Sequence, residues 1–162
     1  MIWRTHWVIA FLLVGMPMSA GALSPPASET EAQLLARLQT EQNPVKKSKE
    51  ETRVARIKLR QAIEAYTQGK TGQGVELLSA FLGRIKDSWQ ILKSSGRNAA
   101  RDPRGFRELD IELREDVRML EDLQRRISYF DRGPVESTEK ELEQMRAEVL
   151  QALFPPARTP KP

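Results

Sequence analysis

The chain has no cysteine, and its single histidine, His6, lies within the first 22 residues. Zinc, copper and non-haem iron sites draw mainly on thiolate and imidazole ligands, so a chain without those residues has almost no means of building one. Catalytic triads that use histidine as their base are excluded for the same reason. We therefore expect no cofactor and no metal, and a fold held together without disulfides.

Long hydrophobic runs are also scarce. The run over residues 7–14 is too short for the roughly 20 residues that a helix needs to cross a bilayer. Arg4 precedes this run, and helix breakers and small residues ending at Ala22 follow it, which is the order of a secretory signal peptide. We predict that residues 1–22 are removed between Ala22 and Leu23, that the mature form has no transmembrane span, and that the protein is secreted. Retention of the segment as an anchor is the alternative.

Strand signals are absent, because no stretch shows sustained polar–apolar alternation and no hairpin dipeptide occurs. Apolar residues recur at spacings of three and four instead, which predicts an all-α fold, a small antiparallel helical bundle of about four helices. The predicted organisation is a linker and short helix over residues 23–44, a helical domain over residues 45–154 and a disordered proline-rich tail over residues 155–162.

Capping and turn residues set the expected helix ends. The first three predicted helices are a short one opened by a capping box of Ser28 and Glu31, one from Val45 to about Gln68, and one that follows a turn at Lys70-Thr71 and runs to about Ser95. The fourth is opened by Asp102-Pro103 and ended by Gly133-Pro134, and the last is opened by a capping box of Thr138 and Glu141 and ended by Pro155-Pro156. The residues expected on the apolar faces of the last three are Val75, Leu78, Leu82, Ile85, Trp89 and Leu92, then Phe106, Leu109, Leu113, Val117, Leu120, Ile127 and Phe130, then Leu142, Met145, Val149 and Leu153.

Arginines are frequent between residues 101 and 132, but this stretch has eight basic and nine acidic residues. Asp110, Glu121 and Asp122 each precede an arginine by four positions, the favourable order for an ion pair along a helix. The stretch is therefore predicted to be a solvated helix face that pairs within itself, and not a nucleic-acid surface.

Unbalanced positive charge lies between residues 43 and 60, where seven cations face two acids, and in a second basic stretch over residues 84–104. We predict that the first segment is a solvent-facing surface for an anionic partner: a lipid headgroup, an acidic polymer of the cell envelope or an acidic protein face. The alternatives are that it only keeps the protein in solution, or that it pairs inside the fold with the acidic last helix. The candidate residues are Lys46, Lys47, Lys49, Arg53, Arg56 and Arg60.

The segment AIEAYTQGKTGQGVELLSAFL, residues 62–82, resembles the middle of a tetratricopeptide-type helical hairpin, with a small residue, an aromatic, a turn glycine and a second small residue at Ala62, Tyr66, Gly69 and Gly74. One such unit is visible, whereas arrays of these repeats need about three. Residues 101–132 are in addition similar to uncharacterised bacterial exported helical proteins that pair such a hairpin with a proline-started charged helix. That resemblance implies a periplasmic location and no particular activity.

These observations favour an exported, non-catalytic helical protein that binds or connects partners in the cell envelope. The expected partner is a protein or an anionic envelope component, and the oligomeric state is left open. The alternatives are a chaperone-like or structural envelope protein and a hydrolase that uses two carboxylates. The acids lie among basic neighbours on charged faces, where nothing in the sequence indicates a raised carboxylate pKa, so we do not expect an enzyme.

Overall fold

The computed structural model describes residues 30–156, and every regular element in this range is helical. The elements are α1 (Glu31–Thr40), α2 (Pro44–Thr67), α3 (Thr71–Ser94), α4 (Phe106–Arg126), the short 3-10 helix η1 (Tyr129–Asp131) and α5 (Arg132–Leu153). The predicted all-α class is confirmed for these residues, which contain five α-helices. The predictions for residues 1–22, for cleavage between Ala22 and Leu23 and for the end of the tail, residues 157–162, lie outside the described residues.

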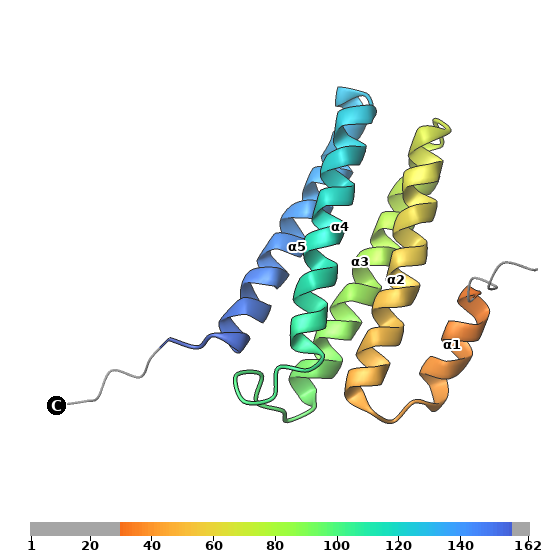
Figure 1. Cartoon of the computed structure of the whole chain (residues 1–162). Coiled ribbons are helices and arrows are strands. Elements are labelled where there is room, and N and C mark those ends of the chain that lie inside the picture. Colours follow the sequence, from red (N-terminus) through yellow and green to blue (C-terminus); the bar gives the residue numbers. More distant parts are fainter. Residues whose placement is uncertain (1–29, 157–162) are drawn as a thin grey trace, which may run out of the picture.

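The helices form two antiparallel hairpins, α2 with α3 and α4 with α5, which pack side by side (Figure 1). α2 and α4 both begin at the lower end of Figure 1, and α3 and α5 run back towards it. α1 lies on the outer side of α2 and packs mainly against that helix. Gly69 ends α2 with a φ of 73°, a left-handed conformation that favours glycine and lets the chain turn sharply into α3.

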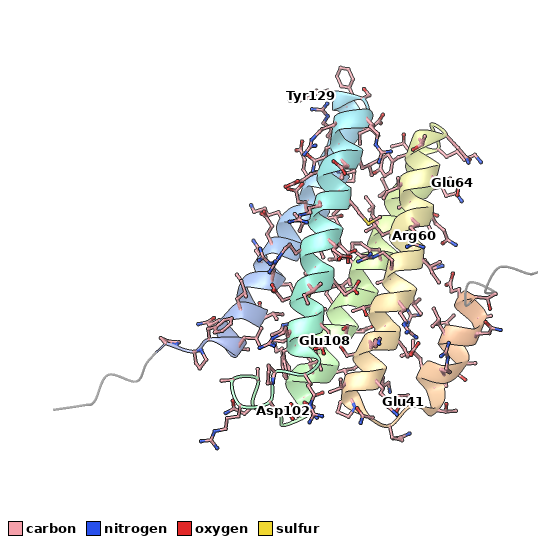
Figure 2. The ribbon with its side chains drawn as sticks, in the orientation of Figure 1. Glu41, Arg60, Glu64, Asp102, Glu108 and Tyr129 are labelled. Carbon is pink, nitrogen blue, oxygen red and sulfur yellow. The ribbon has the colours of Figure 1, made fainter. Side chains whose placement is uncertain are left out.

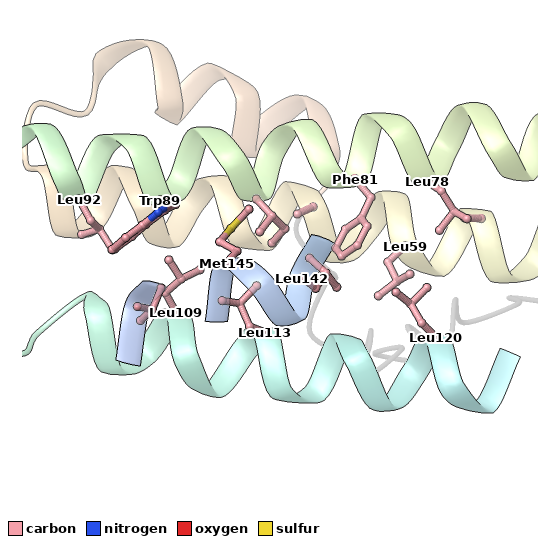
Figure 3. Close-up of a cluster of buried hydrophobic side chains, with 14 of the residues drawn as sticks. Leu59, Leu78, Phe81, Trp89, Leu92, Leu109, Leu113, Leu120, Leu142 and Met145 are labelled. Atoms are coloured by element: carbon pink, nitrogen blue, oxygen red, sulfur yellow. The ribbon is translucent and has the colours of Figure 1, made fainter. Parts of the chain in front are cut away.

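Apolar side chains from α2, α3, α4 and α5 meet along the middle of the molecule (Figure 3). Leu59 of α2, Phe81 of α3, Leu113 of α4 and Leu142 of α5 are all fully buried there. Each helix contributes one apolar stripe, so burial of these stripes holds the two hairpins together.

The predicted apolar face of α3 is largely confirmed. The buried members are Leu78, Ile85, Trp89 and Leu92. Val75 is instead 38% exposed, and Leu82 is half-buried. Phe81, which the spacing pattern leaves out, is fully buried, so the face that α3 turns to the core is wider than a seam at spacings of three and four.

The start of α1 differs from the prediction. Thr30 caps this helix: its Oγ1 accepts a hydrogen bond from the Gln33 backbone N–H, and the Gln33 side chain accepts one from the Thr30 N–H. The capping box therefore lies two residues later than expected, and Ser28 itself lies outside the described residues. The small cluster that attaches α1 to α2 consists of Leu34, Leu38 and Val54. Asn43 caps α2 by accepting from two backbone N–H groups, and Pro44 follows at the first helical position.

α4 begins at Phe106, three residues later than the Asp102-Pro103 signal predicts. Gly105 takes the cap position with a φ of 87°, and the Asp102 carboxylate binds two arginines of the preceding loop instead. A Cβ at Gly105 would lie 2.8 Å from the Leu92 side chain. The left-handed conformation of this glycine, packed against the end of α3, therefore marks the start of α4.

Gly133-Pro134 is predicted to end a helix. Both residues lie instead in the first turn of α5. A proline is tolerated there because the first N–H groups of a helix have no intrahelical acceptor. Thr138, predicted as a cap, lies inside α5, and its hydroxyl donates to the Pro134 backbone oxygen over 2.9 Å. α4 ends at Arg126, and Phe130, predicted on its apolar face, lies in the connecting turn and is 92% exposed.

Candidate functional site

A groove of ≈ 520 Å³ lies between the N-terminal halves of α2 and α4. Buried residues form its base: Ser48 and Thr52 of α2, Gly105 at the cap of α4, and Leu109 of α4. More exposed residues form its rims: Lys46 and Lys49 on α2, and Glu108, Ile111 and Glu112 on α4. Figure 2 shows Glu108 near the lower end of α4. The groove therefore has a cationic edge on α2, an acidic edge on α4 and an apolar contribution from Ile111, which is 46% exposed.

The structure does not bring the six predicted basic residues together on one solvent-facing surface. Lys46, Lys49 and Arg60 are exposed and make no ion pair with another described residue, but only the two lysines line the groove. Lys47 is half-buried, and its positive charge opposes the rise that burial causes in the pKa of the neighbouring Glu51. Arg53 binds Glu50 over 3.1 Å, and Arg56 turns towards α4.

Arg56 is the centre of a charged cluster between α2 and α4. Its Nη2 lies 2.6 Å from Glu112 Oε2 and 3.2 Å from Glu115 Oε2, and its Nε lies 2.9 Å from Asp116 Oδ1. One guanidinium therefore serves three carboxylates, which leaves an excess of negative charge around it. The alternative in which the basic segment pairs inside the fold holds for Arg56, but with α4 and not with the last helix.

Asp116 is the most deeply buried acid of this cluster, with 1% of its surface exposed. Burial raises the pKa of Asp116 to about 7, and the nearby carboxylates Glu112 and Glu115 add to the shift, whereas Arg56 opposes it. The expectation that no carboxylate pKa is raised is therefore wrong at this position. Because the carboxyl group is closed off from solvent, it can hold a proton near neutral pH but has no access to a dissolved substrate.

The charged stretch over residues 101–132 pairs partly within itself, as predicted. The predicted pairs that form are Asp110–Arg114 at 3.0 Å and Glu121–Arg125 at 3.6 Å. Arg126 donates instead to the backbone oxygen of Asp122 over 3.1 Å. The buried Asp110 also binds Arg146 of α5 over 2.8 Å, so this stretch is more than a solvated face and ties α4 to its neighbour.

Acidic residues of α5, the last helix, form ion pairs with lysines of α3, which carries much of the second basic stretch. Lys86 lies 2.6 Å from Glu141, and Lys93 lies 3.8 Å from Glu148. Between them, the Trp89 Nε1 donates to Glu148 Oε2 over 2.9 Å, so the indole satisfies its one polar atom at the edge of the core. Trp89 is 8% exposed, which confirms the expected burial.

Within residues 30–156, no three His, Cys, Asp or Glu side chains gather in a way that could hold a metal ion. The helices of the same range include none that is long and apolar enough to pass through a bilayer. Comparisons of the chain with models of known protein families, with curated proteins and with solved structures find no match. The groove and the surfaces of this chain are therefore the features that bear on its function.

Proposed function

We propose that this chain is an exported, non-catalytic helical protein of the cell envelope that binds a protein partner in the groove between α2 and α4. The observation that carries the proposal is the α2 rim of the groove, where Lys46 and Lys49 are exposed and make no ion pair with a described residue. Lys46 lies in the first turn of α2, where the positive end of the helix dipole opposes an exposed cation by about 0.3–1 kcal/mol. A cation kept at this cost is consistent with a binding role.

The occupant that fits the groove is an amphipathic helix with one acidic edge. Side chains of two adjacent helices form the kind of groove into which a third helix packs. Its acidic edge would face Lys46 and Lys49, and its apolar face would contact Ile111. A uniformly anionic polymer fits less well, because Glu108 and Glu112 on the opposite rim would repel it.

We also propose two finer features of the fold. We treat α2–α5 as a four-helix bundle and the α2–α3 hairpin as a single tetratricopeptide-like unit. Supporting this, Gly74 packs so closely on Tyr66 that a Cβ at Gly74 would lie 2.6 Å from the ring. A small residue against an aromatic across the two helices is what the resemblance implies. Export rests on the predicted signal peptide over residues 1–22.

Photocrosslinking from the groove tests the proposed partner site. The chain has no cysteine, so one introduced cysteine can carry a photoreactive group without side reactions. Ile111→Cys places this group on the groove rim. Gly83→Cys on α3 is the control position, because Gly83 is exposed and a Cβ there meets no atom within 4 Å. Both proteins are illuminated with the envelope fraction of the cells that make the chain, and the crosslinked peptides are identified by mass spectrometry.

The expected product from Ile111→Cys is an acidic amphipathic helix that Gly83→Cys does not capture. Adding Lys46→Glu with Lys49→Glu should reduce this product at least about tenfold, because like charges then face each other across the interface. The matched control is Lys70→Glu with Lys140→Glu, which makes the same charge change at sites outside the groove. Equal capture from both cysteine positions, or capture of many unrelated segments that ignores the lysine reversal, would contradict the proposal; the second result favours a chaperone-like protein.

A further inference from the structure

The connection between α3 and α4 concentrates positive charge at one end of the bundle. We call residues 97–107 the arginine loop; it contains one acid, Asp102, and four arginines, Arg97, Arg101, Arg104 and Arg107. Figure 2 shows Asp102 at the lower end of the molecule. None of the four arginines lines the groove between α2 and α4. The arginine loop is therefore a charged surface separate from the proposed partner site.

Local hydrogen bonds and one buried side chain anchor the arginine loop to the bundle. The Asn98 Oδ1 accepts from the backbone N–H groups of Ala100 and Arg101, over 3.0 and 3.2 Å. Ala99, between them, is 6% exposed and belongs to the main core cluster. Gly105 then leads the chain into α4. The backbone that carries the arginines is therefore held against the core, and the long side chains extend from an ordered turn.

Asp102 holds two of the four guanidinium groups together. Its Oδ1 lies 3.0 Å from Arg104 Nε, and its Oδ2 accepts from both Arg97 and Arg104. Hydrogen bonds from Arg104 and then Arg97 lower the pKa of Asp102 to about 2, so this carboxylate is ionised at neutral pH. One negative charge serves two arginines here, whereas Arg101 and Arg107 are exposed and make no ion pair with another described residue. The loop therefore keeps a clear excess of positive charge.

The rest of this end does not neutralise the loop. We count the described residues of both connections at the lower end of Figure 1 and the six nearest residues of each helix that meets this end. Nine are cations and five are acids: Arg37, Lys46, Lys47, Lys49, Lys93, Arg97, Arg101, Arg104 and Arg107 against Glu41, Asp102, Glu108, Asp110 and Glu148. The next acids along α2 and α4 already have partners further from this end, since Glu50, Glu51 and Glu112 bind Arg53, Arg84 and Arg56. The surplus of cations is therefore a property of the whole end.

We propose that the arginine loop docks on the surface of a membrane that contains anionic phospholipids. A guanidinium group can donate two parallel hydrogen bonds to one phosphate, and clustered basic residues are attracted to negatively charged headgroups. Phe154 follows α5 at the same end and is 73% exposed, so an aromatic ring is also available to enter the boundary between headgroups and acyl chains (Figure 1).

A lipid surface suits the arrangement of these cations better than an acidic protein does. The cations come from separate parts of the fold: the start of α2, the α3–α4 connection and the start of α4. Mobile headgroups can gather beneath cations that are spread over a whole end, whereas a protein would need acids at matching positions. The bundle would then meet the membrane with its lower end. This inference goes beyond the proposed partner site and does not depend on it.

A fluorescent reporter in the arginine loop tests the proposal on the full chain. Ala100→Cys is suitable because Ala100 is exposed and its contact with Asn98 is made by the backbone. Gly83→Cys, at an exposed position of α3, is the control. Each introduced cysteine is labelled with nitrobenzoxadiazole and titrated with vesicles of phosphatidylcholine, with or without phosphatidylglycerol. The readout is local, so attachment of the chain through its N-terminal segment does not imitate it.

The expected result is a blue shift and a rise in emission from the Ala100→Cys label, but not from the Gly83→Cys label, with vesicles that contain phosphatidylglycerol. Arg101→Gln with Arg107→Gln should require at least about tenfold more lipid for the same response, because each basic residue near the surface contributes to the attraction. The melting temperature should not change, since neither arginine has an ion pair to lose. Arg118→Gln with Arg126→Gln removes the same charge from exposed arginines elsewhere on α4 and should have little effect.

Four outcomes would overturn the proposal. Three are a loop label that responds no more than the control label, a full response of the Arg101→Gln, Arg107→Gln variant, and an equal response to neutral vesicles. The fourth is loss of the response when polyglutamate is added at the same concentration of acidic groups as the phosphatidylglycerol, which would identify an acidic protein face as the preferred partner. The vesicles contain no protein, so the lipid response is independent of the groove.

Discussion

Replacing Asp116 with asparagine should stabilise the protein near neutral pH, although the change removes one partner of a buried ion pair. Asp116 is 1% exposed and shares the Arg56 guanidinium with Glu112 and Glu115. Loss of a partner from a buried pair usually costs about 3–5 kcal/mol because a charge is left unpaired. Here Arg56 keeps two carboxylates after the change, and a neutral side chain of the same shape replaces a carboxylate that is poorly compensated.

The expected size follows from the pKa of Asp116, which burial raises from 3.8 to about 7. A pKa raised by folding means that the folded protein keeps a proton that the unfolded chain releases. The stability from this proton is complete below the unfolded pKa of 3.8 and is lost as the pH rises through about 7. The shift corresponds to about 4 kcal/mol, so Asp116→Asn should gain at most about 4 kcal/mol near pH 8 and less than about half of that near pH 5.

Urea unfolding followed by circular dichroism at both pH values measures this difference, provided that the slope with denaturant stays the same. Glu51 and Glu139 also have pKa values raised by burial, so the wild-type protein has other contributions of the same sign; comparison with the variant isolates that of Asp116. Asp110→Asn is the matched control, because Asp110 is buried on the same helix but has two arginine partners, and its loss should cost about 1–3 kcal/mol. A loss of more than about 1 kcal/mol for Asp116→Asn near pH 8 would refute the reasoning.

Two further changes test the core. Gly74→Ala should destabilise the protein by about 1–3 kcal/mol in thermal or urea unfolding, because its Cβ would lie 2.6 Å from the Tyr66 ring. Gly72→Ala on the same helix meets open space, so it should be neutral or gain up to about 1 kcal/mol. Equal effects of the two substitutions would contradict the packing of Gly74 on Tyr66. Trp89→Ala should lower the free energy of unfolding by about 3–5 kcal/mol, whereas Tyr129→Ala, at an exposed position, should lower it by less than about 0.5 kcal/mol. A loss below about 1 kcal/mol for Trp89→Ala would mean that the indole is not part of the core.

The all-α class and the apolar faces could be predicted because both depend on spacing within one helix. The starts of α4 and α5 could not, because they depend on contacts made elsewhere. Asp102-Pro103 is a sound local signal for a helix start, but the Asp102 carboxylate binds Arg97 and Arg104 in the folded chain. Gly105 then opens α4 in a left-handed conformation that favours glycine, packed against Leu92 of α3. Competition between a local cap and a tertiary contact is invisible in a single sequence.

The basic segment illustrates the same limit for the candidate site. Lys46, Lys49 and Arg56 lie at spacings of three and seven, which places them on one face of α2. α4 packs on this face at Arg56 and leaves the two lysines at the edge of the groove. The sequence therefore predicts the shared face, but only the position of the neighbouring helix separates an interior ion pair from two cations at a groove rim.

α4 forms one rim of the groove, and its position is fixed from both sides. Arg56 of α2 binds its middle through three carboxylates, and Arg146 of α5 binds Asp110 nearer to the groove. Rotation of α4 about its axis would break these contacts and move Ile111 out of the groove rim. The acidic rim of the groove therefore lies on a helix that cannot turn freely.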